Sequence, residues 1–279
     1  MNIKHFTKIG LLLTSLCAFL SGCSNSDYYA SISNDLRGDE LKEALSELIY
    51  HEKAINYANV SSYYTKTDSA GEPNKIKLFY NGQVVSTKMT DPDYMPYTSD
   101  DDDPNGINRE HVWCQSRFRI YGSMTDPVHY GKAENPGPAT DLYNVRPCLG
   151  SINQARSNYI YSESHTSQTF DPAVIEGGEE ASRGEIARIL FYCATRYLKL
   201  ELVEDDSVPY SGRSNKMGNL DYLLKWNLAY APSDLEKQRN DAIQEVQGNR
   251  NPFVDHPEYA CRIYGNKSDA TKEICKEYL

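Results

Sequence analysis

The chain contains one long apolar segment, which runs from Ile9 to Leu20 and follows Lys4 and Lys8. A positive segment, ~7–15 apolar residues and a small-residue cleavage site form the pattern of a secretory signal peptide. The apolar run is about a dozen residues long, whereas a membrane-spanning helix needs ~20. We therefore expect residues 1–22 to be removed and the fold to be built from the more polar remainder of the chain.

The end of this segment, Leu20-Ser21-Gly22-Cys23, resembles the lipobox of bacterial lipoproteins. The resemblance implies that Cys23 becomes the first mature residue and carries a diacylglycerol anchor, which holds the protein at the cell envelope, on the outer membrane or the cell surface. Residues 23–38, which are polar and lack periodicity, would then serve as a tether. The alternative is an ordinary secreted protein with an unmodified Cys23.

The mature chain is acidic. Removal of residues 1–22 deletes two lysines and no acid, so the formal charge changes from -10 to -12 over the remaining 257 residues. Net acidity opposes non-specific binding to nucleic acid, because that affinity depends on cations that meet phosphates. The local distribution differs from the net charge, since several arginines gather around residues 105–158: Arg109, Arg117, Arg119, Arg146 and Arg156.

Apolar spacing and capping signals predict three helices. The first begins after Asp39, the expected N-cap, and has leucines at helical spacing. The second begins at the capping box Ser182-x-x-Glu185 and is expected to run to about Leu202. The third begins at Ser233-x-x-Glu236 and ends at Gly248.

Alternating apolar residues over 75–88, interrupted by Asn81-Gly82, predict a β-hairpin with a type I′ turn. Two short stretches, His111–Trp113 and Leu142–Val145, are expected to pair as antiparallel strands, and a helix is expected from Ser151 onward. The fold class is therefore α+β, a mainly helical single domain over residues 39–279 with short antiparallel strands. With 39% apolar and 11% aromatic residues, the chain can form a packed core.

The segment around residues 105–158 has the residue types that phosphodiester hydrolysis needs. His111 is suited to act as a general base, because the unperturbed pKa of histidine is ~6.5. Glu110 and Asn153 offer hard oxygen ligands, which favour magnesium, calcium or manganese. Adjacent strand residues point to opposite faces, so Glu110 and His111 can share a site only at the end of the strand or at a bend.

The polar helix from Ser151 strengthens this hypothesis. Asn153, Arg156 and Ser157 are three and four positions apart, so they are expected on one helical face that suits a metal-bound phosphate. A Glu-His pair taken alone is more often a surface or satisfied core pair. The functional assignment therefore rests on the combination of His111, Glu110 and the polar helix, not on the Glu-His pair alone.

Three blocks, "NREHVW", "DLYNVRP" and "GSINQARSN", together resemble the bacterial endonuclease I family, extracellular or periplasmic nucleases with a ββα-metal (His-Me finger) site. Two later blocks, "RGEIARILFYCATRY" and "QGNRNPFVDHPEYA", continue the resemblance in the same order. The five blocks span most of residues 105–260. The resemblance implies a domain built around the ββα-metal motif.

The resemblance also implies roles for individual residues. His111 would be the general base, and Glu110 and Asn153 would be the metal ligands. Asn144 would brace the motif loop and His111, and Asp141 would help to hold the motif. Arg146 and Arg156 are the candidates for phosphate contacts, with Lys132 as a substitute.

The implied activity is metal-dependent endonucleolytic hydrolysis of DNA, with RNA as a further substrate, little sequence specificity and 5′-phosphate products. One divalent cation is expected, Mg²⁺ with Ca²⁺ or Mn²⁺ as alternatives. We expect a monomer. The competing hypothesis is a non-catalytic surface-binding lipoprotein on a nuclease-like scaffold, which the acidity, the anchor and the 22 tyrosines would suit.

Five cysteines remain after Cys17 and Cys23 are set aside. Cys261 and Cys275 bracket a short polar loop and are expected to form a disulfide, and Cys193 is expected to be a free buried thiol. Cys114 and Cys148 stand where the endonuclease I family usually has proline and a small residue. If the two motif strands are neighbours, these two cysteines could form a second bridge.

Overall fold

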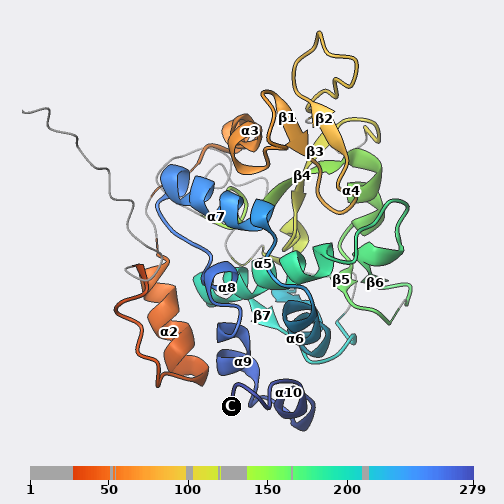
Figure 1. Cartoon of the computed structure of the whole chain (residues 1–279). Coiled ribbons are helices and arrows are strands. Elements are labelled where there is room, and N and C mark those ends of the chain that lie inside the picture. The colour runs from red at the N-terminus through yellow and green to blue at the C-terminus, as the bar shows by residue number, and fades with distance from the viewer. Residues whose placement is uncertain are drawn as a thin grey trace, which may run out of the picture. The chain divides into compact units, whose positions relative to one another are not determined.

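The computed structural model describes residues 28–50, 53, 55–98, 103–118, 120, 137–164, 166–208 and 214–279 (Figure 1). It divides into two units, residues 1–31 and 32–279. The expected signal peptide, Cys23 and Lys132 lie outside the described residues. No described helix is long and apolar enough to cross a membrane.

The second unit combines short helices with two-stranded sheets, so the α+β class is confirmed. Two of the described sheets are antiparallel as expected, whereas β5 pairs with β6 and β7 with β8 in parallel. Its elements follow one another along the chain in this order: α2 (Gly38–Leu48), η1 (Tyr57–Tyr63), α3 (Tyr64–Thr67), β1 (Lys75–Lys77), β2 (Val84–Ser86), β3 (Ile107–His111), η2 (Gln115–Arg117), β4 (Val145–Leu149), α4 (Gly150–Arg156), β5 (Ile160–Tyr161), β6 (Thr169–Phe170), η4 (Pro172–Val174), α5 (Ser182–Arg196), β7 (Glu201–Leu202), β8 (Lys216–Met217), α6 (Leu220–Ala229), α7 (Asp234–Gln247), α8 (Pro252–Asp255), α9 (Tyr259–Tyr264) and α10 (Asp269–Ile274).

Strands β3 and β4 are antiparallel, and α4 follows β4 directly and contacts both (Figure 1). The expected order of strand, strand and helix is confirmed, but both strands are shifted from their predicted ranges, with which they share only His111 and Val145. β3 ends at His111, because the backbone N–H of Trp113 donates to the side chain of Asn144. β4 begins only at Val145, since the preceding residues form a turn in which Asp141 O accepts from Val145 N.

The predicted hairpin is present as β1 and β2, but its turn is not type I′. A type I′ turn requires positive φ at both central residues. Positive φ occurs instead at Tyr80 (72°) and Gly82 (65°), with Asn81 between them. Leu78, Phe79 and Tyr80 are buried, so tertiary packing determines the conformation of this loop.

Helix α5 occupies a central position in the core, where it contacts α2, α6 and α8. Twelve of its residues are buried. Its expected capping box is absent, because the Ser182 hydroxyl donates to Glu179 O and Glu185 pairs with Arg146. The helix ends at Arg196 rather than Leu202, since Glu201 and Leu202 pair with β8 as strand β7.

Other helix ends agree better with the sequence. Helix α2 lies where predicted, although its N-cap is Arg37 and Asp39 lies in the first turn. The Ser233 side chain accepts from Glu236 N at the start of α7, and Gly248 ends this helix with a left-handed φ of 97°.

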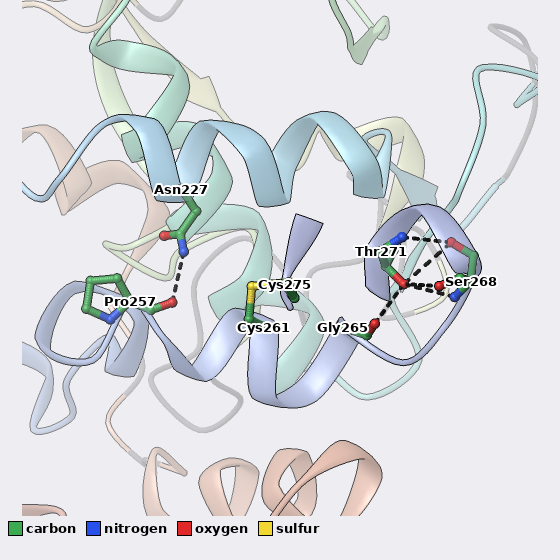
Figure 2. Close-up of a disulfide and its surroundings, with 7 residues drawn as sticks. All are labelled: Asn227, Pro257, Cys261, Gly265, Ser268, Thr271 and Cys275. Carbon is green, nitrogen blue, oxygen red and sulfur yellow. Dashed lines mark hydrogen bonds between the residues drawn. A yellow bond between two sulfur atoms is a disulfide. The ribbon is translucent and has the colours of Figure 1, made fainter. Parts of the chain in front are cut away.

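The disulfide between Cys261 and Cys275 is confirmed and joins α9 to the residue after α10 (Figure 2). Ser268 and Thr271 form a reciprocal capping box at the start of α10. Cys193 is a free buried thiol, as expected. The prediction of a second disulfide, between Cys114 and Cys148, was wrong, because both cysteines are free. Cys148 is paired with Asn108 in the β3–β4 ladder, and Cys114 lies beyond the end of β3.

Candidate active site

His111 is the last residue of β3, and both of its ring nitrogens have partners. Nε2 lies 3.0 Å from the carbonyl oxygen of Ala139, and Nδ1 lies 3.1 Å from the side-chain nitrogen of Gln115. A carbonyl oxygen can only accept, so Nε2 of the neutral ring carries the hydrogen and Nδ1 keeps its lone pair. The contacts therefore select the tautomer in which Nδ1 is basic.

Burial keeps this imidazole neutral. Desolvation is the largest cause that lowers the pKa of His111 from 6.5 to about 4. The hydrogen bond to Ala139 acts in the opposite direction, while the charges of Arg109 and Arg156 lower the pKa further. A neutral ring at physiological pH is the state that a general base requires.

The Glu110 carboxylate is buried, and one of its oxygens is fixed. Oε1 accepts from the Tyr80 hydroxyl at 2.7 Å and lies 3.3 Å from Nε of Arg156. The Tyr161 hydroxyl lies 3.4 Å from the same oxygen. Burial raises the pKa of Glu110, and the charge of Arg156 opposes this shift. No described side chain donates to Oε2, which leaves this oxygen for a ligand.

Glu110, His111 and Asn153 line one cavity of about 240 Å³. The remaining lining residues come from β3, from η2 and the residue before it, and from the end of α4 and the two residues after it: Arg109, Cys114, Gln115, Ser116, Arg156, Ser157 and Asn158. Glu110 and His111 share the cavity although they are adjacent, because β3 ends at His111. The Asn153 side chain projects from α4 and makes no hydrogen bond within the described part of the chain.

The donor atoms in this cavity fit a hard divalent cation. Glu110 offers a carboxylate oxygen and Asn153 offers an amide oxygen, and Mg²⁺ commonly takes one or two protein oxygens and completes its shell with water and phosphate. The described residues include no group of three or more His, Cys, Asp and Glu side chains that could hold a metal. A carboxylate–amide pair is a smaller set, which relies on water and substrate for its remaining ligands.

Arg146 is not at this cavity. It is buried in an ion-pair cluster, where its guanidinium contacts Asp68 at 2.8 Å and Glu185, and it lies over the ring of Phe79. These partners come from segments far apart in the sequence. Its contacts do not support the phosphate role that the sequence suggested.

Arg156 does line the cavity, but its nitrogens are already engaged. Nε contacts Glu110 and the Tyr161 hydroxyl, and the terminal nitrogens donate to the carbonyl oxygens of Ser157 and Val112. Ser157 itself follows the helix with a φ of 49°, so it does not continue the expected polar face. Arg156 thus serves as the partner of Glu110 rather than as an open phosphate contact.

Asn144 and Asp141 are buried, and their side chains form hydrogen bonds with residues around the motif. The Asn144 amide accepts from Trp113 N at 2.7 Å and donates to Pro138 O at 2.8 Å, next to the Ala139 carbonyl that contacts His111. The Asp141 carboxylate accepts from the hydroxyls of Tyr192 and Tyr197, the side-chain amide of Gln247 and the backbone N–H of Tyr143.

Three residues near the base were not assigned from the sequence. Tyr57 stacks on His111 with ring centroids 6.0 Å apart, and the guanidinium of Arg109 lies 4.3 Å from the Tyr57 ring centroid. Gln115 donates to the Tyr57 hydroxyl at 3.3 Å as well as to His111. Arg109 lies within the block "NREHVW" and Gln115 two residues after it, so their positions in the sequence point to the site, whereas nothing in the sequence connects Tyr57 to it.

Comparison with known sequences decides the family. The Endonuclease I family profile matches residues 37–258, a range that contains every residue of the cavity. The chain belongs to the endonuclease I family. Membership makes it a nuclease, that is, a phosphodiester hydrolase, and the non-catalytic alternative is set aside.

The similar proteins have nuclease names. An extracellular ribonuclease of Bacillus subtilis (strain 168) is 30% identical over 268 residues, which cover 90% of this chain and 83% of the relative. Endonuclease-1 of Buchnera aphidicola subsp. Baizongia pistaciae (strain Bp) is 32% identical over 172 residues, 54% of this chain and 62% of the relative. An extracellular deoxyribonuclease of Aeromonas hydrophila is 24% identical over 196 residues, 64% of this chain and 78% of the relative.

Proposed function

We propose that this member of the endonuclease I family is an exported, metal-dependent endonuclease that cleaves DNA, and also RNA, with little sequence specificity and leaves 5′-phosphate ends. The observation that carries the proposal is the cavity shared by Glu110, His111 and Asn153. This arrangement supplies a neutral base and two hard oxygen ligands around one small space. Hydrolysis of a phosphodiester needs both.

His111 acts as the general base through Nδ1. Its Nε2–H donates to Ala139, so a proton from water can be accepted only at Nδ1. The Gln115 amide gives up its contact with Nδ1 when water takes that position. The water oxygen then bonds to phosphorus as Nδ1 of His111 removes a proton, the bond between phosphorus and the 3′-oxygen breaks, and that oxygen takes a proton from solvent to become a 3′-hydroxyl.

Glu110 and Asn153 would hold one divalent cation, Mg²⁺ in the first instance and Ca²⁺ or Mn²⁺ as alternatives. When bound, the cation supplies positive charge that stabilises the phosphate oxygens and the leaving oxygen. Tyr80 and Arg156 orient the Glu110 carboxylate through Oε1, and Oε2 is the oxygen that would hold the cation. Nucleases of this family generally depend on a divalent metal.

The substrate range is inferred from the relatives and from the type of contact. The relatives named above include a ribonuclease and a deoxyribonuclease. Contacts to phosphate position a protein without reading bases, so they support activity on both polymers. We infer export from the names of the same relatives and from the N-terminal sequence, with Cys23 as the lipid anchor and a secreted form as the alternative.

The proposal is tested by incubating the soluble domain from residue 32 onward with supercoiled plasmid and with RNA, with and without EDTA. We expect cleavage of both, loss of cleavage in EDTA, and a 10²- to 10⁴-fold lower kcat for His111→Ala, which is the usual contribution of general-base catalysis. His256→Ala is the matched control, because that histidine pairs with Glu258 and does not line the cavity. Unchanged kcat in His111→Ala would overturn the assignment.

The anchor is tested separately in the full chain. Cys23→Ser should move the enzyme from the membrane fraction to the soluble fraction, and mass spectrometry of the wild-type N-terminus should show a lipid-modified Cys23. An unmodified N-terminus in the soluble fraction would leave the secreted alternative.

A further inference from the structure

Arg109 differs from Arg117, Arg146 and Arg156 in the groups that its charged side chain contacts. Arg146 and Arg156 are buried in ion pairs with carboxylates, and Arg117 donates to backbone carbonyl oxygens. None of the described carboxylates forms an ion pair with Arg109. Its cross-strand neighbour in the ladder is Pro147, which offers no acceptor side chain.

The Arg109 side chain is nevertheless held in place. Its guanidinium lies over the Tyr57 ring at 4.3 Å from the centroid, a cation–π contact that stabilises the charge without consuming the N–H donors. Its Nε is buried and has no hydrogen-bond partner among the described residues. The guanidinium is therefore held over the Tyr57 ring, and none of the described residues accepts a hydrogen bond from its terminal nitrogens, which are the donors for a ligand.

The position of Arg109 relates it directly to the base. Arg109 and His111 are two residues apart in β3, so their side chains leave the same face of the strand, and both line the cavity. Tyr57 connects them, because its ring stacks on His111 with an interplanar angle of 11°. An anion bound at Arg109 would lie next to the imidazole.

We propose that Arg109, supported by Tyr57, binds a phosphate of the nucleic acid substrate beside His111. A guanidinium presents a planar fork of N–H donors that matches two phosphate oxygens, whereas an ammonium is a point charge. Arg109 thereby takes the role that the sequence suggested for Arg146 and Arg156. This inference rests on the proposed nuclease function.

The experiment measures binding without turnover. A fluorescent single-stranded oligonucleotide is titrated in EDTA with His111→Ala protein that carries a second substitution, and anisotropy gives Kd at several salt concentrations. Arg109→Met keeps an apolar stem over Tyr57 and removes the charge. We expect Kd to rise on the order of 10-fold and the salt slope to fall by about 0.7, the value for one phosphate contact on a single strand.

Matched variants separate a specific contact from general charge and from misfolding. Lys237→Ala removes an exposed positive charge that pairs with Asp234 on α7 and should leave Kd within about 2-fold. Tyr57→Ala should weaken binding several-fold, and Tyr57→Phe should recover most of that loss because it keeps the ring under Arg109. Arg109→Lys should recover part of the affinity lost in Arg109→Met. Circular dichroism checks that each variant is folded.

The two proposals fail in different ways. If wild-type protein cleaves nucleic acid and Arg109→Met leaves both Kd and the salt slope unchanged, the Arg109 inference is overturned and the nuclease function stands. An equal loss in Lys237→Ala would likewise overturn it, because the effect would then reflect net charge. If wild-type protein does not cleave, the proposed function itself is overturned.

Discussion

Nε of Arg156 lies 3.3 Å from Oε1 of Glu110, and both side chains are buried. A buried charge without its partner is costly, because the remaining ion cannot be solvated by water. Arg156 therefore secures the residue that is proposed to hold the metal, and its loss should affect folding before it affects chemistry.

Arg156→Ala should lower the free energy of unfolding by about 3–5 kcal/mol, the usual cost of breaking a buried ion pair. Urea denaturation followed by circular dichroism measures this change. Ser151→Ala, on the exposed side of the same helix, should stay within about 0.5 kcal/mol of wild type. A wild-type denaturation midpoint for Arg156→Ala would contradict a stabilising role of the pair.

The pH dependence of cleavage should reflect the lowered pKa of His111. The base is active when neutral, so a folded-state pKa of about 4 extends activity well below the usual histidine range. We expect kcat/KM at saturating Mg²⁺ to stay nearly constant from pH 7 to about pH 5 and to fall through about pH 4. An acid limb centred near pH 6.5 would show that His111 is solvated in the working enzyme.

The lowered pKa of His111 also makes the folded protein less stable in acid. Between the unfolded pKa of ~6.5 and the folded value, the unfolded chain binds a proton at residue 111 and the folded chain does not. The contribution of His111 to stability therefore decreases as the pH falls through this range. Thermal unfolding at pH 7 and pH 4.5 should show the lower Tm at pH 4.5, and His111→Gln should reduce the difference.

Metal binding should depend on the two oxygen ligands. Glu110→Gln and Asn153→Ala should each raise the Mg²⁺ concentration for half-maximal cleavage on the order of 10- to 100-fold, at least as much as the loss of a residue that only orients a ligand. Asn153→Asp keeps an oxygen ligand and should bind Mg²⁺ more tightly than Asn153→Ala. Asn158→Ala is the control, since that amide lines the same cavity without an assigned ligand role. If Asn158→Ala raised the required Mg²⁺ concentration equally, Glu110 and Asn153 would no longer be distinguished as the metal ligands.

The disulfide should contribute to stability and not to catalysis. Replacement of both Cys261 and Cys275 by alanine should lower the free energy of unfolding by about 3 kcal/mol, the chain-entropy value for a loop of this length. Plasmid cleavage at 25 °C should be unchanged, because neither residue lines the cavity. Thiol titration of the unfolded, unreduced domain from residue 32 onward should detect the three free cysteines, Cys114, Cys148 and Cys193.

Local patterns predicted much of this fold. Apolar spacing located α2, the capping serine and terminal glycine bounded α7, and the loop between Cys261 and Cys275 indicated the disulfide. The predicted type of the turn after β1 was wrong, because burial of Tyr80 against Glu110 overrides the preference of Asn81-Gly82 for a type I′ turn.

The site could be predicted only in part, for a similar reason. His111, Glu110 and Asn153 occur in compact motifs, and the structure brings them to one cavity. The partners of Arg146 could not be found in this way, because Asp68 is 78 residues away and no local pattern joins the two. The same applies to Tyr57, whose contact with Arg109 exists only in the folded chain.

Tyr57 belongs to η1, a short helix that precedes β3 by more than forty positions along the chain. Transplanting β3, β4 and α4 into an unrelated scaffold would thus carry over the base and both oxygen donors but leave behind the aromatic ring beneath Arg109. Such a graft should retain the chemistry and hold nucleic acid weakly. Designers who reuse this motif would need to supply an equivalent ring from the new host.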